Sequence, residues 1–87
     1  MNILTVRKKP VAVQAVKLER DRLQMPADWC GGKIQYGSDG KPIGVTVETL
    51  SGKVLALIGD YVMKGVKGEF YPCKSDIFTE TYELIAW

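Results

Sequence analysis

The segment KGVKGEFYPCKSDIF, residues 64–78, holds most of the side chains that could do chemistry. It carries three lysines, three aromatic rings, one cysteine and two carboxylates. Ammonium groups attract phosphate or carboxylate, and aromatic faces stack on planar ligands such as bases. We therefore predict an anion-binding patch, with one further aromatic from an earlier turn, formed by Lys64, Lys67, Tyr71, Lys74 and Trp29. The alternative is that these lysines only solubilise the chain and protect the edge of a sheet.

The same sequence argues against enzyme chemistry. It contains no histidine, which is the usual base of a nucleophilic triad and the commonest general acid at neutral pH. Asp60, Glu69 and Asp76 are the carboxylates expected to lie near one another, but no nucleophile accompanies them. No glycine-rich phosphate loop occurs at a strand-to-helix junction. We expect a protein that is not an enzyme, with no catalytic residue, metal or cofactor.

Chain length, composition and net charge limit the number of domains and the kinds of partner that we expect. The 87 residues form one expected domain, residues 1–87, with 46% hydrophobic and 25% charged residues, which is ordinary globular composition. The net charge of +2 is too small to indicate nucleic acid as a partner. Arg7, Lys8 and Lys9 end a basic arm, residues 1–9. A small core often needs self-association, so a homo-oligomer is expected.

No apolar stretch is long enough for a signal peptide or a membrane span, so a cytoplasmic protein without membrane contact is expected. Cys30 and Cys73 are far apart and lack C-x-x-C spacing. Two reduced thiols are therefore favoured in that compartment, while a disulfide or a paired metal site stays open.

Alternating apolar residues and turn signals predict a chain of short strands. Pro26 can open a short helix, and Gly31 can end it in the left-handed conformation, with Trp29 anchoring that turn to a sheet. Asp60 follows Gly59 and is interpreted as a turn residue that bonds nearby backbone amides. The fold class is mainly β (α+β): a small curved antiparallel barrel or roll with one or two short helices. The strands expected before the last hairpin are residues 11–18, 33–36, 45–50 and 53–58, with turns at 37–42 and at Ser51-Gly52.

The last hairpin is predicted to pair residues 61–66 with 69–73 across Lys67-Gly68. A two-residue link places Lys64 opposite Tyr71, so that both side chains share one face. Met63 and Phe70 would then share the other face, which is the better candidate for the core.

After this hairpin, Ser75 is the expected N-cap of a helix over residues 76–81. Phe78 and Tyr82 are four residues apart, so they should lie on one face of that helix. Residues 83–87 are a candidate last strand.

The segment GDYVMKGVKGEFYPCKSDIF, followed by TYE, resembles the ending of a group of small bacteriophage and prophage proteins. Its matching positions are Gly59, Asp60, Tyr61, Gly65, Gly68, Glu69, Tyr71, Cys73, Asp76, Phe78, Tyr82 and Glu83. Residues 10–18 resemble the first strand of the same group, whereas residues 33–44 show little similarity. The resemblance implies a phage setting and a partner in the infected host, and it carries over no catalytic residue.

Residues and resemblance together predict a non-enzymatic binding protein. The first hypothesis is that it counters host defence by sequestering a small phosphorylated ligand, such as a signalling nucleotide, on the lysine patch. The second is an inhibitor or adaptor that docks on a host protein through a free strand edge or through the aromatic end around Phe78, Tyr82 and Trp87. The third is a minor component of the virion.

Overall fold

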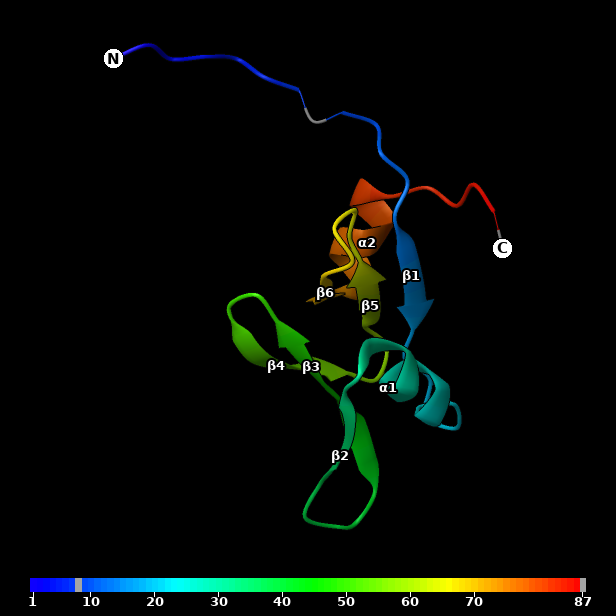
Figure 1. The fold of residues 1–87 in the computed structure, drawn as a ribbon. Helices are drawn as coiled ribbons and strands as arrows, with labels where there is room; N and C mark the ends of the chain where they lie inside the picture. Colours follow the sequence, from blue (N-terminus) through cyan, green and yellow to red (C-terminus); the bar gives the residue numbers. More distant parts are fainter. Residues whose placement is uncertain (8, 87) are drawn as a thin grey trace.

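Six short strands and two short helices make up the domain (Figure 1). The structure is a computed structural model that describes residues 1–7 and 9–86. Within these residues, each helix has seven residues, and no helix is both long and apolar enough to cross a membrane. The elements are β1 (Gln14–Lys17), α1 (Gln24–Cys30), β2 (Lys33–Tyr36), β3 (Pro42–Thr49), β4 (Gly52–Leu57), β5 (Tyr61–Lys64), β6 (Phe70–Cys73) and α2 (Ser75–Thr81).

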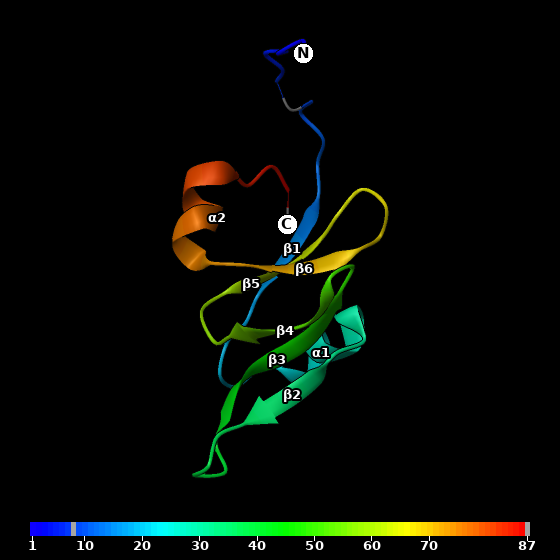
Figure 2. The ribbon, with the colours of Figure 1, turned by 90° about the vertical axis from the view of Figure 1, so that its left-hand side faces the viewer.

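The strands form two antiparallel three-stranded sheets, with strand orders β1-β5-β6 and β2-β3-β4. The long β3–β4 hairpin crosses below β6, and α1 packs on β3 (Figure 2). This arrangement confirms the predicted mainly β fold with two short helices. The sheets stay separate, so the molecule is a curved roll rather than a closed barrel.

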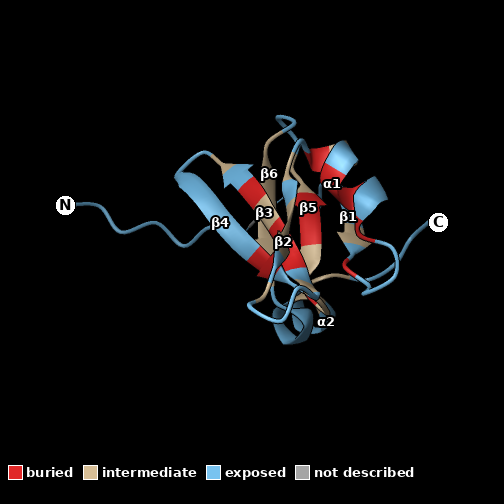
Figure 3. Cartoon of the chain, turned by 90° about the horizontal axis from the view of Figure 1, so that it is seen from below, coloured by how far each residue is buried: buried red, intermediate tan, exposed pale blue. Residues whose placement is uncertain are grey.

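The hydrophobic core lies between the two sheets and α1. In Figure 3 the buried positions gather along β3, β5 and α1. Leu18, Val45, Val47, Ala56 and Val62 are fully buried, at 0% exposure. The cluster is completed by Leu23, Ala27 and Cys30, with Val16, Trp29, Ile34, Ile58 and Phe70 packed around it.

The helix α1 ends as its sequence predicts. Gly31 has φ = 67°, and its N–H bonds to the Asp28 carbonyl at 3.3 Å. This left-handed residue lets the chain turn sharply into β2 without a Cβ clash. The helix starts at Gln24, two residues before Pro26, because the Leu23 carbonyl already accepts the Ala27 N–H at 3.0 Å.

Two predicted strands need correction. The strand predicted over residues 11–18 is shorter, because β5 ends at Lys64 and offers no partner beyond Gln14. In the β3–β4 hairpin the loop residues are Leu50 and Ser51, while Gly52 pairs with Thr49 as the first residue of β4. The predicted Ser51-Gly52 link is therefore displaced by one residue.

The last hairpin carries the most consequential correction. Its loop has three residues, Val66 to Gly68, and the register places Lys64 opposite Phe70 and Met63 opposite Tyr71. The Gly68 N–H bonds to the Gly65 carbonyl at 3.0 Å, and Gly68 has φ = 82°. This is a tight turn followed by a left-handed residue, which inserts one residue more than a two-residue link.

A one-residue shift of register moves side chains to the opposite face of a sheet. Lys64 and Tyr71 therefore point to opposite sides of β5–β6, and the predicted shared face is wrong. Met63 and Phe70 are separated in the same way: Phe70 packs on the core between the sheets, and Met63, 1% exposed, lies on the other face.

The helix α2 begins at Ser75, so Lys74 and not Ser75 occupies the N-cap position. Asp76 is in its first turn, as predicted, where a carboxylate favours the positive end of the helix. Residues 82–86 form no strand in this structure, which corrects that prediction, and Trp87 lies outside the described residues.

Candidate functional site

Lys64 and Trp29 meet at the ring of Phe70, on the core side of the last hairpin. The Lys64 Nζ lies 5.7 Å from the centre of that ring. The Trp29 ring meets Phe70 edge-on, with centroids 5.1 Å apart and an angle of 77°. This contact confirms that Trp29 anchors the α1 turn to a sheet. The Lys64 ammonium group and the Trp29 and Phe70 rings contact one another, so they contribute to packing within the chain.

Tyr71 lies on the other side of the hairpin, close to Tyr82, the residue that follows α2. Burial, followed by a hydrogen bond with Tyr82, raises the pKa of Tyr71 from 10.0 to about 12. Negative charge on Tyr82, Glu69 and Cys73 also raises the pKa of Tyr71. Tyr71 is therefore a neutral phenol at physiological pH that fastens α2 to the sheet.

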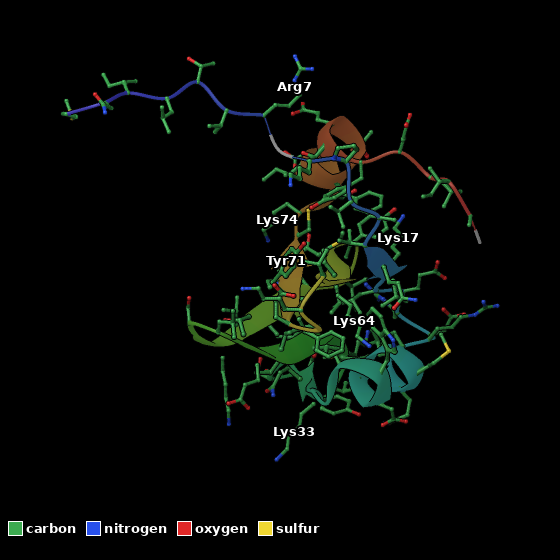
Figure 4. All side chains as sticks on the ribbon, turned by 45° about the horizontal axis from the view of Figure 1, so that its top comes forward. Arg7, Lys17, Lys33, Lys64, Tyr71 and Lys74 are labelled. Atoms are coloured by element: carbon green, nitrogen blue, oxygen red, sulfur yellow. The ribbon has the colours of Figure 1, made fainter. Side chains whose placement is uncertain are left out.

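The other two lysines of the predicted patch are separated as well. Lys74 forms an ion pair with Asp60, with Nζ 3.1 Å from Oδ2. Lys67 is exposed at the hairpin turn, where its backbone N–H donates to the Glu69 carboxylate at 3.1 Å. Figure 4 shows Lys64 apart from Tyr71 and Lys74. The structure thus does not bring the five predicted ligand-binding residues together.

The acidic residues are also divided. Asp60 and Asp76 share a shallow hollow at the start of α2 with Lys74 and Glu80, whereas Glu69 lies along the last hairpin. Asp60 accepts the Leu57 N–H at 3.1 Å, which confirms its interpretation as a turn residue. Among residues 1–7 and 9–86, no group of three histidine, cysteine or acidic residues could hold a metal ion.

Both cysteines are free thiols, with Cys30 buried and Cys73 half-buried. Burial raises the pKa of both thiols, and the charges of Asp60 and Asp76 raise that of Cys73 further. A raised pKa keeps a thiol protonated and a poor nucleophile. The prediction of two reduced cysteines agrees with this arrangement.

Three aromatic rings form a stack on the α2 side of the first sheet. The Phe78 and Tyr82 rings lie close together, with centres 5.5 Å apart, although Tyr82 follows the helix in an extended conformation instead of sharing a helix face as predicted. Tyr61 of β5 lies flat against Phe78 at 3.7 Å and 7°. Sequence spacing predicted that Phe78 and Tyr82 would be close, but not that Tyr61 would stack on Phe78, because Tyr61 is far away in sequence. The stack is engaged within the chain, so it is a weak candidate for a docking end.

The free edges of the two sheets are a feature that the predicted patch did not include. An edge strand presents unpaired N–H and C=O groups that can pair with another chain. On β6 this capacity is reduced, because Pro72 points outward and has no N–H to donate. The edge of β4 differs, since each of its residues carries an N–H.

Half of the backbone groups of β4 face away from β3. The Ile58 N–H donates to the Ile43 carbonyl at 3.0 Å, which fixes this as a hydrogen-bonded pair. Hydrogen-bonded and open pairs alternate, so Lys53, Leu55 and Leu57 direct their groups outward. Asp60 takes both groups of Leu57, through its carboxylate at 3.1 Å and its own N–H at 2.9 Å.

Lys53 and Leu55 are left with open backbone groups, for which no hydrogen-bond partner occurs in the described part of the chain. Apolar side chains line this edge: Val54, Leu55 and Leu57 are 40–42% exposed, and Leu50 at the hairpin tip is 86% exposed. Figure 3 shows β4 as a nearly continuous exposed strand.

A surface groove runs beside β4, between the β3–β4 hairpin tip and β6. It is lined by Thr49, Leu50, Ser51, Val54, Glu69, Phe70, Tyr71 and Pro72. We refer to the open groups of Lys53 and Leu55, with Leu50, Val54 and Leu57, as the β4 edge. This edge combines directional backbone hydrogen bonding with apolar contacts, which is the combination that binds an extended peptide.

The raised pKa of Tyr71 predicts a loss of stability at alkaline pH. Because the folded-state pKa of about 12 exceeds the ordinary value of 10.0, the stabilisation is complete below pH 10 and is lost as the pH rises toward 12. Urea unfolding on either side of pH 10 should show this decline. Tyr71→Phe should make it shallower, while Tyr36→Phe, at an exposed ring, should not. Equal slopes for Tyr71→Phe and wild type would contradict the assignment.

Comparison with known proteins adds no relative: no family model, curated protein or solved structure matches this chain.

Proposed function

We propose that this chain is a non-enzymatic protein-binding module, an inhibitor or adaptor that takes an extended segment of a partner protein onto the β4 edge. The supporting observation is the pair of outward-facing backbone groups at Lys53 and Leu55, flanked by exposed apolar side chains. The resemblance to phage proteins makes a host protein in the infected cytoplasm the expected partner.

The chemistry of the edge describes the segment it would bind. Alternate side chains of an added strand lie on opposite faces. One set would lie beside Val54 at the groove, and the other beside Leu55 and Leu57 on the opposite face. Lys53 is a charged residue of the kind that protects edges from indiscriminate pairing. The partner segment is therefore expected to be apolar, extended and to carry a carboxylate opposite Lys53.

The hypothesis of a small phosphorylated ligand has lost its geometric support. It required Lys64 and Tyr71 on one face, and the hairpin register separates them. Lys74 has its charge balanced by Asp60. A minor virion component stays a prediction, which mass spectrometry of purified particles would test.

A proline at position 55 tests the proposed edge. Leu55→Pro removes an N–H that β3 does not use, so the hairpin ladder keeps its hydrogen bonds. Linear peptides are first selected from a random displayed library for binding to the wild-type protein. We expect these peptides to bind Leu55→Pro about tenfold or more weakly, because the variant lacks one hydrogen bond and its proline ring blocks the edge.

Leu55→Ala is the matched control, because it shortens the same side chain and keeps the N–H. It should weaken the selected peptides less than Leu55→Pro does, and circular dichroism should show both variants folded. The proposal would be overturned by selected peptides that bind Leu55→Pro as tightly as wild type, or by a library that yields no binder.

A further inference from the structure

The described residues of the N-terminal arm, 1–7 and 9, are exposed and extend from the domain. Ile3, Leu4 and Val6 are 83%, 78% and 81% exposed. The arm and α2 lie at the same end of the molecule, and the arm runs outward from there (Figures 1 and 2). The radius of gyration, 14.7 Å, exceeds the roughly 12 Å expected of a compact chain of this length. Three apolar side chains are thus held out in solvent.

A second exposed surface lies on α2 and the tail that follows it. Ile77, Leu84 and Ile85 are 52%, 67% and 74% exposed. Ile77 and Glu80 are three residues apart, so they share one side of the helix. The opposite side carries Phe78, which stacks on Tyr61. We use the name acidic helix face for the exposed acidic and apolar residues of α2 and of the tail that follows it: Asp76, Ile77, Glu80, Glu83, Leu84 and Ile85.

The arm and the acidic helix face complement each other in charge as well as in apolar character. Residues 1–9 contain three basic and no acidic residues, and residues 75–86 contain three acidic and no basic ones. Each surface therefore offers apolar side chains beside an excess of one sign of charge, since Lys74, the basic residue next to Asp76 and Glu80, is paired with Asp60. Complementary fields of this kind select and orient a partner.

We propose that the acidic helix face binds the N-terminal arm of a second copy of this chain, so that two copies exchange arms across a two-fold axis. The direction of the arm favours a second copy, because its apolar residues extend away from their own α2. A two-fold arrangement makes the contact twice, which closes the assembly as a dimer. This surface is separate from the β4 edge, so the two proposals stand independently.

Charge reversal on either surface should abolish the dimer. Arg7→Glu with Lys9→Glu makes the arm acidic, and Glu80→Lys with Glu83→Lys makes the helix face basic. All four residues are exposed, so both variants should fold normally. Sedimentation should give the wild type twice its chain mass of 9.7 kDa and each variant a single chain mass. Wild-type association should weaken as salt increases.

Mixing the two variants distinguishes exchange between copies from folding back within one copy. In the mixture, each acidic arm meets a basic helix face and each basic arm meets an acidic face, so a one-to-one heterodimer should form. Reversal at two other exposed residues, Lys33→Glu with Lys41→Glu, is the matched control and should leave the wild-type dimer intact. A wild type that stays monomeric at every concentration, or a mixture that yields no heterodimer, would overturn the proposal.

Discussion

Replacing Leu18 with alanine is expected to lower the free energy of unfolding by about 3 kcal/mol. Leu18 is 0% exposed and belongs to the cluster between the two sheets. Its backbone also ties β1 to the turn before β5, because its N–H bonds to the Asp60 carbonyl at 2.9 Å and its carbonyl accepts the Gly59 N–H at 2.8 Å. Those bonds hold the side chain in place, so the core cannot collapse fully onto the cavity.

Leu50→Ala removes the same atoms from a side chain that is 86% exposed, and it should change the stability of the free protein by no more than about 0.5 kcal/mol. Urea unfolding of both variants measures the difference. Similar midpoints for the two would show that Leu18 is not part of the core.

Gly44→Ala is expected to be comparably destabilising, by about 3 kcal/mol. A Cβ at this position would run into the Ala56 carbonyl oxygen and lie 2.9 Å from the Ala56 carbonyl carbon and 3.0 Å from the Leu57 Cα. These atoms are backbone of the neighbouring strand, so relief requires β3 and β4 to separate. The same change would disturb the β4 edge.

Gly65→Ala is the control for this steric argument. The three atoms nearest to an added Cβ there belong to the Glu69 carboxyl group, the end of a flexible side chain that can rotate away at the cost of its exposed bond with the Lys67 N–H. We expect a cost below about 1 kcal/mol. Thermal or urea unfolding of the two variants tests the contrast, and a Gly44→Ala protein as stable as Gly65→Ala would contradict the close β3–β4 packing.

Local patterns predicted most of the elements but not their register. Gly31 had one obvious use, at the end of a helix, and the structure confirms it. Glycine in a hairpin is less informative, since it can be a loop residue, as Gly68 is, or the first residue of the next strand, as Gly52 is. Both alternatives satisfy the same alternation of apolar residues. In β3–β4 the loop was therefore misplaced by one residue, which shifts each pairing partner by two and leaves the side chains on their predicted faces. In β5–β6 the longer loop shifts each partner by one and exchanges the faces.

The predicted site failed because of that register. A shift of one residue places Lys64 and Tyr71 on opposite faces of the hairpin. Closeness in sequence had suggested the patch, but it does not determine which face each side chain occupies. The Asp60–Lys74 ion pair and the Tyr61–Phe78 stack join residues that are distant along the chain. The open groups of the β4 edge are those that neither β3 nor Asp60 hydrogen-bonds, and they can be identified only when the strand pairing is known.

Residue-resolved amide hydrogen exchange tests the proposed docking edge most directly. In the free protein, the amides of Lys53 and Leu55 should exchange quickly. Those of Val54 and Ala56 should exchange slowly, because only these two N–H groups are directed at β3. With a selected peptide bound, we predict that Lys53 and Leu55 become protected while Val54 and Ala56 change little. Protection confined to residues 64–74, with Lys53 and Leu55 still exchanging quickly, would contradict this account.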